Sequence, residues 1–188
     1  MIVGITGRVG VGKSKAVEII QTTFKDVSIF DLDLIGHELL LTNKLKQQCV
    51  DLFSKKILDQ NKEIDRSILG QIVFADQEKL NQLNRIIHPE ICSYVKNKII
   101  ECKQENNLII IAGALILEIG LVDSCDKMIT IDANNQKIIQ KIGQKYARIA
   151  KHQRSKEEYN DNSDKVIINN FDLEFSKDIV NAINQYNK

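Results

Sequence analysis

Apolar positions along the chain fall either into short continuous runs or into longer stretches with helical spacing. The continuous runs, rich in Ile, Leu and Val, occupy residues 1–6, 27–30, 107–112, 127–132 and 165–169. Runs of this length predict strands that are buried on both faces, as in a parallel sheet. Because helical patterns separate them, the sequence predicts an α/β fold with a five-stranded parallel sheet, flanking helices and right-handed crossovers.

The stretch between the second and third predicted strands is much longer than one crossover requires. From residue 34 to residue 107 the apolar residues recur at helical spacing and no convincing strand is present. A crossover between parallel strands usually takes a dozen or more residues. We therefore expect residues 34–107 to form a helical insertion within a single domain that spans residues 1–188.

The only proline of the chain, Pro89, follows His88 inside this insertion. Proline suits the first turn of a helix because it has no N–H group, so Pro89 predicts the start of a new helix with His88 at the preceding turn. His88 has two interpretations. It is either a structural turn residue or a residue that contacts a ligand.

A glycine-rich stretch follows the first predicted strand and precedes a helix that we expect to end near Phe24. Residues 7–14 read Gly-Arg-Val-Gly-Val-Gly-Lys-Ser, a complete G-x-x-x-x-G-K-[ST] string, or P-loop. Backbone N–H groups of such a loop and of the following helix bind phosphates, while the lysine reaches the β- and γ-phosphates and the serine hydroxyl ligates Mg²⁺. The residues expected to contact the nucleotide are Gly10, Val11, Gly12, Lys13, Ser14 and Lys15.

Carboxylates end the second predicted strand, at Asp31 and Asp33. Ligands of an open parallel sheet bind at the carboxyl ends of the strands, so Asp33 is expected to face the same crevice as the P-loop. Asp33 is a candidate base or Mg²⁺ partner. Alternatively it is the N-cap of a helix over residues 34–41, and one aspartate can do both.

A strongly basic segment follows the fourth predicted strand. Residues 137–156 contain seven lysines and arginines and no acidic residue, and as one helix they present a basic face. This face is either a solvated lysine surface or a mobile lid over the P-loop. We favour a lid over residues 136–160, because Arg148 and Arg154 lie here and guanidinium groups suit a transferring phosphoryl group.

The overall composition is that of a soluble globular protein, with 43% hydrophobic residues, 27% charged residues and a net charge of +1. This small net charge indicates no broad basic surface for binding nucleic acid or anionic membranes. No apolar run approaches the length of a membrane span, and no signal peptide is evident. The four cysteines form no zinc pattern, so we expect reduced thiols and a cytoplasmic protein; the oligomeric state is not indicated.

Several strings besides the P-loop are spread over nearly the whole chain. They are Ile5-Thr6-Gly7 with the P-loop, Phe30-Asp31-Leu32-Asp33-Leu34-Ile35, Ile64-Asp65-Arg66, Val73-Phe74-Ala75-Asp76, Leu83-Asn84-Arg85-Ile86-Ile87-His88-Pro89, Arg148-Ile149 with Gln153, and Asp164-Lys165-Val166-Ile167-Ile168-Asn169-Asn170. The D-x-D, V-F-A-D and H-P strings in that order are far more specific than the P-loop alone. Together these strings resemble those of the bacterial dephospho-coenzyme A kinases.

The resemblance implies transfer of the γ-phosphoryl group of ATP to the ribose 3′-hydroxyl of dephospho-CoA, the last step of coenzyme A synthesis, with Mg²⁺ as cofactor. It implies that Asp33 deprotonates or orients the hydroxyl, that Lys13 holds the phosphates and that Arg148 closes from the lid. The helical insertion is then the acceptor-binding part. The implied substrate-binding residues are Thr6, Asp33, Arg85 and His88.

The chain departs from the family pattern in the P-loop, where Val11 and Lys15 also differ from the usual serine and threonine, in the third strand and in the lid. Arg8 stands where the family usually has glycine, and the third strand runs into Ala112-Gly113 without the family's carboxylate and proline. The segment between Gln136 and Arg148 is shorter than the usual lid.

Three alternatives use the same features differently. Asp33-Leu34-Ile35-Gly36 and Asn43-Lys44 are superficially GTPase-like, but Lys46 replaces the expected specificity aspartate. A nucleoside or nucleotide monophosphate kinase of the same fold shares the P-loop, the aspartate and the basic lid. A catalytically silent ATP-binding module is the third alternative.

Overall fold

The computed structural model divides the chain into two compact units. The first unit comprises Met1–Leu32 and Lys96–Lys188, and the second comprises Asp33–Val95. The structure describes residues 1–103, 108–143 and 145–186, and within them all side chains except those of Lys103, Lys145 and Arg148.

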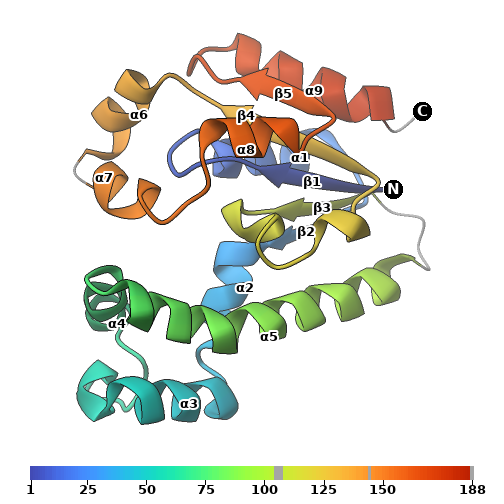
Figure 1. The fold of residues 1–188 in the computed structure, drawn as a ribbon. Helices are drawn as coiled ribbons and strands as arrows, with labels where there is room; N and C mark the ends of the chain where they lie inside the picture. The colour runs from blue at the N-terminus through green and yellow to red at the C-terminus, as the bar shows by residue number, and fades with distance from the viewer. Residues whose placement is uncertain (104–107, 144, 187–188) are drawn as a thin grey trace. The chain divides into compact units, whose positions relative to one another are not determined.

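A five-stranded parallel sheet forms the centre of the first unit (Figure 1). Its spatial order is β2-β3-β1-β4-β5, and every neighbouring pair is parallel. The carboxyl ends of the strands therefore lie along one edge, as the α/β prediction requires. The five predicted strands are confirmed as β1 (Ile2–Thr6), β2 (Val27–Asp31), β3 (Leu108–Ala112), β4 (Lys127–Asp132) and β5 (Lys165–Ile168).

The helices α1 (Lys13–Thr23) and α9 (Glu174–Tyr186) pack against each other and against one face of this sheet (Figure 1). Asp172 Oδ1 accepts hydrogen bonds from the N–H groups of Glu174 and Phe175, so Asp172 caps α9. The core between the helices and the sheet is aliphatic and includes Val3, Ile5, Ile20, Ile110, Ile129, Ile179 and Ile183.

The basic segment after β4 is not a single helix, so that prediction was wrong. It forms α6 (Asn135–Ile142), α7 (Lys145–Ala150) and α8 (Lys156–Asp161), which we call the α6–α8 segment. Gly143, with φ of 60°, ends α6 in a conformation that favours glycine. Ser155 starts α8 with a capping box to Glu158. The basic residues therefore do not share one continuous helical face.

The second unit is helical. Among the described residues between β2 and β3, the structure has an isolated bridge between Leu58 and Ile64 but no strand. Its helices are α2 (Leu32–Leu39, whose first residue belongs to the first unit), α3 (Asn43–Phe53), the 3₁₀ turn η1 (Lys55–Ile57), α4 (Arg66–Phe74) and the greater part of α5 (Gln77–Lys103). The helical character predicted for residues 34–107 is confirmed for residues 34–103, and residues 104–107 lie outside the described part of the chain.

Pro89 lies inside α5, which is one continuous helix, so the predicted helix start at this residue was wrong. Ile87, Ile91 and Val95 are buried along this helix, and Ile87 and Ile91 approach Gly36 of α2. This packing outweighs the local cost of a proline in a helix. A second local expectation also failed: α2 begins at Leu32, so Asp33 lies in its first turn and is not its N-cap.

Two further 3₁₀ turns, η2 (Ala114–Ile116) and η3 (Val122–Ser124), join β3 to β4. In the described ranges, no helix is both long and apolar enough to cross a membrane.

Candidate active site

Glycines set the shape of the P-loop between β1 and α1. Gly7, Gly10 and Gly12 have φ values of 134°, 80° and 108°, which side chains rarely adopt. A Cβ atom at Gly12 would also overlap the side-chain amide nitrogen of Asn169. The loop is therefore closely packed as well as conformationally restricted.

Asn169, the residue after β5, fixes the other side of the loop. Its side chain is buried, and Nδ2 donates to the carbonyl oxygen of Val11 at 2.8 Å. Its backbone N–H donates to the carbonyl oxygen of Asp132 at 2.7 Å. Asn169 thus links the loop to the ends of β4 and β5. The string from Asp164 to Asn170, in which it lies, did not indicate this role.

The P-loop lysine bonds within the loop. Lys13 Nζ donates to the carbonyl oxygens of Gly7 and Arg8, at 2.9 and 3.0 Å. Lys13 is also the first residue of α1, whose N-cap is Gly12, a residue with no side chain to cap the first N–H groups. A phosphate bound at this helix start would meet both the lysine and backbone donors.

The two residues after Lys13 differ in what they can offer a nucleotide. Ser14 is exposed at the start of α1, where its hydroxyl can ligate a cation. Lys15 is exposed and its ammonium pairs with Glu18 at 2.7 Å. The backbone N–H of Lys15, rather than its side chain, is therefore the group suited to the expected contact with the nucleotide.

A buried cluster of charges adjoins the P-loop through Arg8. Arg8 Nη2 donates to Asp132 Oδ1 at 2.8 Å and to the Ala133 carbonyl oxygen at 3.4 Å. Arg8 Nη1 donates to Asn135 Oδ1 at 2.7 Å and to the Tyr146 hydroxyl at 3.2 Å. One guanidinium thus connects the loop to the end of β4, to α6 and to α7.

Asp132 also binds a second cation, because Lys156 Nζ lies 2.6 Å from its Oδ2. Burial raises the pKa of the Asp132 carboxyl, but the hydrogen bonds from Lys156 and Arg8 outweigh this effect and hold the pKa below its usual value. The carboxylate is therefore ionised at neutral pH. Sequence reasoning did not identify Asp132 or Lys156 as site residues.

Gln153 brings the α6–α8 segment onto the P-loop itself. Its Oε1 accepts from the backbone N–H of Val9 at 2.8 Å. By contrast, the side chain of Arg154 pairs with Glu118 and Glu158, each at 3.2 Å, and is occupied within the protein. The side chain of Arg148, the predicted lid arginine, lies outside the described part of the structure, and only its position in α7 is described.

The remaining predicted residues divide between the two units. Thr6 ends β1 in the first unit and is fully buried, and its Oγ1 forms no hydrogen bond within the described part of the chain. Asp33 is the first residue of the second unit and is exposed, two positions after the end of β2. Arg85 and His88 lie close together on α5.

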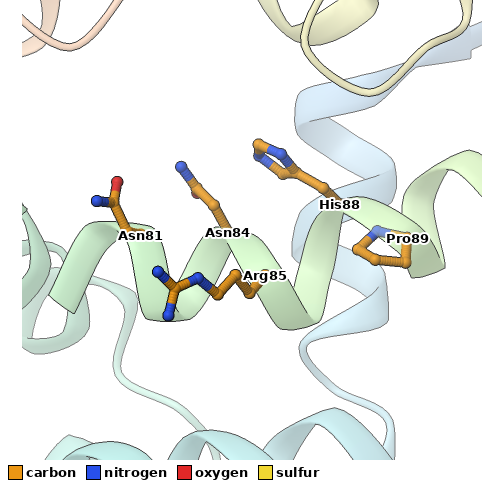
Figure 2. A pocket seen from close by; sticks show the side chains of 5 residues that line it. All are labelled: Asn81, Asn84, Arg85, His88 and Pro89. Atoms are coloured by element: carbon orange, nitrogen blue, oxygen red, sulfur yellow. The ribbon is translucent and has the colours of Figure 1, made fainter. Parts of the chain in front are cut away.

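A pocket in the second unit is lined by polar residues of α5 (Figure 2). Asn81, Asn84 and His88 project to the same side of the helix, and Arg85 projects from an adjacent side, with its guanidinium extending away from Pro89 (Figure 2). Burial lowers the pKa of His88 below its ordinary value of 6.5, so its imidazole is neutral at neutral pH.

Arg85 keeps a largely exposed guanidinium, 3.6 Å from Glu78. Amide groups, a neutral imidazole and an accessible guanidinium together suit a polar or anionic ligand.

The donor set also bears on Mg²⁺. The described side chains contain no group of three or more His, Cys, Asp or Glu that could hold a metal ion. Mg²⁺ commonly takes only one or two protein ligands and completes its shell with substrate phosphates and water. The exposed Ser14 hydroxyl at the end of the P-loop fits this mode of binding.

Comparisons with known proteins agree with this geometry. A family model described as "Dephospho-CoA kinase" matches residues 1–174. A "Dephospho-CoA kinase" of Fusobacterium nucleatum subsp. nucleatum is 34% identical over 181 residues, covering 93% of this chain and 92% of its own length. Another, of Gamma-proteobacterium EBAC31A08, is 32% identical over 193 residues, covering 97% and 95%.

The fold has a solved counterpart in "Dephospho-CoA kinase from Campylobacter jejuni", with a TM-score of 0.69, 23% identity and coverage of 98% of this chain and 96% of that one. The predicted P-loop kinase fold is thereby confirmed. With the family match over residues 1–174 and full-length relatives above 30% identity, this chain belongs to the dephospho-CoA kinase family.

Proposed function

We propose that this chain phosphorylates the ribose 3′-hydroxyl of dephospho-CoA with ATP, giving CoA and ADP, the last step of coenzyme A synthesis. The family match over residues 1–174 carries the proposal. The intact P-loop, with Lys13 at the start of α1, supports its nucleotide-binding half.

Lys13 and Ser14 act on the nucleotide in this proposal. When ATP binds, the Lys13 ammonium leaves the carbonyl oxygens of Gly7 and Arg8 for the β- and γ-phosphates, which are charged and therefore stronger acceptors. The backbone N–H groups from Gly10 to Lys15 surround the β-phosphate. The Ser14 hydroxyl would hold Mg²⁺, which would supply positive charge to offset that of the transferring phosphoryl group.

Asp33 is the proposed base for the acceptor. Its carboxylate accepts the proton of the 3′-hydroxyl as the hydroxyl oxygen forms a bond to the γ-phosphorus. The bond from that phosphorus to the β,γ-bridging oxygen breaks, and ADP leaves with the electron pair. Its position, two residues beyond β2 and in the first turn of α2, supports this role because ligands of such sheets gather at strand ends.

The second unit is the proposed acceptor-binding part. The polar face of α5 offers a guanidinium at Arg85 for a phosphate and a half-buried imidazole at His88. Pro89 makes a further hydrogen-bond acceptor available, the carbonyl oxygen of Arg85, because a proline has no N–H group to donate the helical hydrogen bond to it. Thr6 is the remaining proposed substrate contact, supported by its buried hydroxyl at the end of β1.

Residues 136–160 are the proposed lid, with Arg148 as its arginine. The contacts that Tyr146, Gln153 and Lys156 make with the P-loop or with Asp132 support this proposal, since they place most of the α6–α8 segment beside the phosphate site. We also propose a cytoplasmic location, where both ATP and the reduced thiol of the acceptor are available.

A coupled assay tests the proposal by offering dephospho-CoA, nucleosides and nucleoside monophosphates separately, each with ATP and Mg²⁺. CoA formation from dephospho-CoA, with the nucleosides and monophosphates unused, is the expected outcome. Phosphorylation of a nucleoside or monophosphate while dephospho-CoA is ignored would establish the kinase alternative. ATP binding without any Mg²⁺-dependent product would establish the silent module, and Lys13→Ala supplies the inactive control.

A further inference from the structure

We propose that Lys156 is a phosphate-binding residue of the active site, which exchanges the carboxylate of Asp132 for the phosphoryl group transferred from ATP. The inference rests on the ATP-dependent activity proposed above and adds one residue to its machinery.

Two cations share one buried carboxylate beside the P-loop. Arg8 Nη2 is 2.8 Å from Asp132 Oδ1, Lys156 Nζ is 2.6 Å from Asp132 Oδ2, and the Asp132 side chain is only 3% exposed. Two positive charges and one negative charge leave this cluster with a net positive charge. A partly desolvated surplus of positive charge favours the approach of an anion.

Arg8 is poorly placed to move from this cluster. Its guanidinium forms four hydrogen bonds with protein groups, and its side chain is 11% exposed. Lys156 is 46% exposed and ends in a compact ammonium on a flexible stem. Lys156 is therefore the cation that can leave Asp132 for a new anion, while Arg8 remains to balance the carboxylate.

The segment that carries Lys156 already lies on the P-loop. Gln153, three residues earlier, accepts from the N–H of Val9, within a loop whose N–H groups surround phosphates. This hydrogen bond holds the segment against the P-loop, one residue before the N–H groups that are proposed to surround the β-phosphate. Lys13 likewise donates to backbone carbonyl oxygens.

A triphosphate would offer charged acceptors to both Lys13 and Lys156. Charge-assisted hydrogen bonds are shorter and stronger than those to neutral oxygens. For Lys156 the exchange replaces one anion by another that carries more charge. The γ-phosphoryl group, which only ATP has, is the anion that Lys156 is proposed to bind.

The test compares Lys156→Gln and Lys156→Arg with wild type and with Lys127→Gln. Lys127 is a matched control, because it pairs with Asp164 at 2.9 Å, is 43% exposed, and lies at the opposite end of the strand that ends in Asp132. Calorimetry gives the dissociation constants of ATP and of ADP, each with Mg²⁺ and without acceptor. The assay with dephospho-CoA gives kcat.

Lys156→Gln is expected to weaken ATP binding about tenfold while ADP binding changes less than about twofold. Its kcat falls, Lys156→Arg recovers most of both quantities because the charge is kept, and Lys127→Gln matches wild type. A ratio of ATP to ADP affinity that stays at the wild-type value in Lys156→Gln overturns the proposal. Equal weakening for both nucleotides does so too, because a purely structural partner of Asp132 would not distinguish ATP from ADP.

The binding measurements need no acceptor, so they separate this inference from the proposed function. If dephospho-CoA is not phosphorylated by wild type but the ratio still falls in Lys156→Gln, the proposed function fails and the role of Lys156 stands. If Lys156→Gln forms CoA at the wild-type rate and its ratio of ATP to ADP affinity is unchanged, the proposed function stands and the role of Lys156 fails.

Discussion

The guanidinium of Arg8 and the carboxylate of Asp132 meet at 2.8 Å, although 124 positions separate them in the sequence. Arg8 is the second residue of the P-loop and Asp132 is the last residue of β4. Both side chains are nearly inaccessible to water. The pair therefore ties the phosphate-binding loop to the neighbouring strand with charges that depend on each other for stability.

Asp132→Asn tests how much this pair stabilises the fold. Removing the charge leaves the buried Arg8 guanidinium without its anion, so we expect the free energy of unfolding to fall by about 3–5 kcal/mol. Urea denaturation at neutral pH, followed by circular dichroism, measures the change. Glu18→Gln is the control, because it breaks an exposed pair with Lys15 and should cost less than about 1 kcal/mol. A value for Asp132→Asn as small as the control's would contradict the expected dependence.

The loss of stability in Asp132→Asn, relative to wild type, should also depend on pH. The folded pKa of Asp132 lies below its usual value of 3.8, so the folded protein releases this proton more readily than the unfolded chain. Its contribution is fully present above about pH 3.8 and is lost as the pH falls through the folded pKa. The stability difference between wild type and Asp132→Asn should therefore shrink in that acid range.

Local signals were enough to predict the sheet and the nucleotide-binding loop. Continuous apolar runs mark buried strands whatever their partners are, and the P-loop is contiguous from Gly7 to Ser14. The Arg8–Asp132 pair has no such signal. Nothing near Arg8 in the sequence indicates which carboxylate 124 positions away will neutralise it.

The two wrong helix predictions have different physical causes. The end of α6 has a local signal in the sequence, because glycine is common just after a helix C-terminus and Gly143 occupies that position. The sequence has no local signal that α5 continues through Pro89, because this continuity depends on the packing of Ile87 and Ile91 against α2.

Asp33→Asn tests the proposed base. The amide cannot accept the hydroxyl proton, so kcat should fall by roughly 10² or more, while ATP affinity stays close to wild type. The coupled assay gives kcat and calorimetry gives the dissociation constant of ATP. Asp178→Asn, an exposed change on α9, should leave both unaltered. Turnover at the wild-type rate in Asp33→Asn would remove this residue from the mechanism.

The lowered pKa of His88 predicts that the protein loses stability in mild acid. Burial lowers its pKa below 6.5, so the unfolded chain binds this proton more readily than the folded protein. The stability that comes from neutral His88 is fully present above that value and is lost as the pH falls towards the folded pKa. The urea midpoint of wild type should thus drop between about pH 7.5 and about pH 5.5, and that of His88→Gln should drop less.

His37, exposed on α2, supplies the matched control. His37→Gln should show the same drop of the urea midpoint as wild type, because this change replaces an exposed side chain and leaves His88 in place. An equal drop in His88→Gln and wild type would mean that other groups cause the acid sensitivity.

Gln153→Glu tests the contact between the α6–α8 segment and the P-loop. A carboxylate of the same length would hold the Val9 N–H more strongly than the amide oxygen does and would repel the incoming phosphates. We expect ATP binding to weaken about tenfold, as measured by calorimetry. Gln140→Glu, an exposed change in α6, controls for the added charge. If both variants bind ATP equally well, Gln153 does not face the nucleotide.

Pro89→Ala separates the stability of α5 from its proposed use. Alanine restores the N–H that can bond to the Arg85 carbonyl oxygen and has a higher helix propensity, so we expect a gain of up to about 3 kcal/mol in the free energy of unfolding. Ser93→Ala, one turn further along, is the control and should gain no more than about 0.7 kcal/mol.

The KM for dephospho-CoA should rise in Pro89→Ala and not in Ser93→Ala, because only the first change removes an acceptor and a ring from the pocket wall. A more stable variant with an unchanged KM would show that the proline is dispensable for the acceptor. A less stable variant would show that the ring packs in α5 better than alanine does. Only a gain in stability together with a weaker acceptor site fits a helix that is locally destabilised where it binds its substrate.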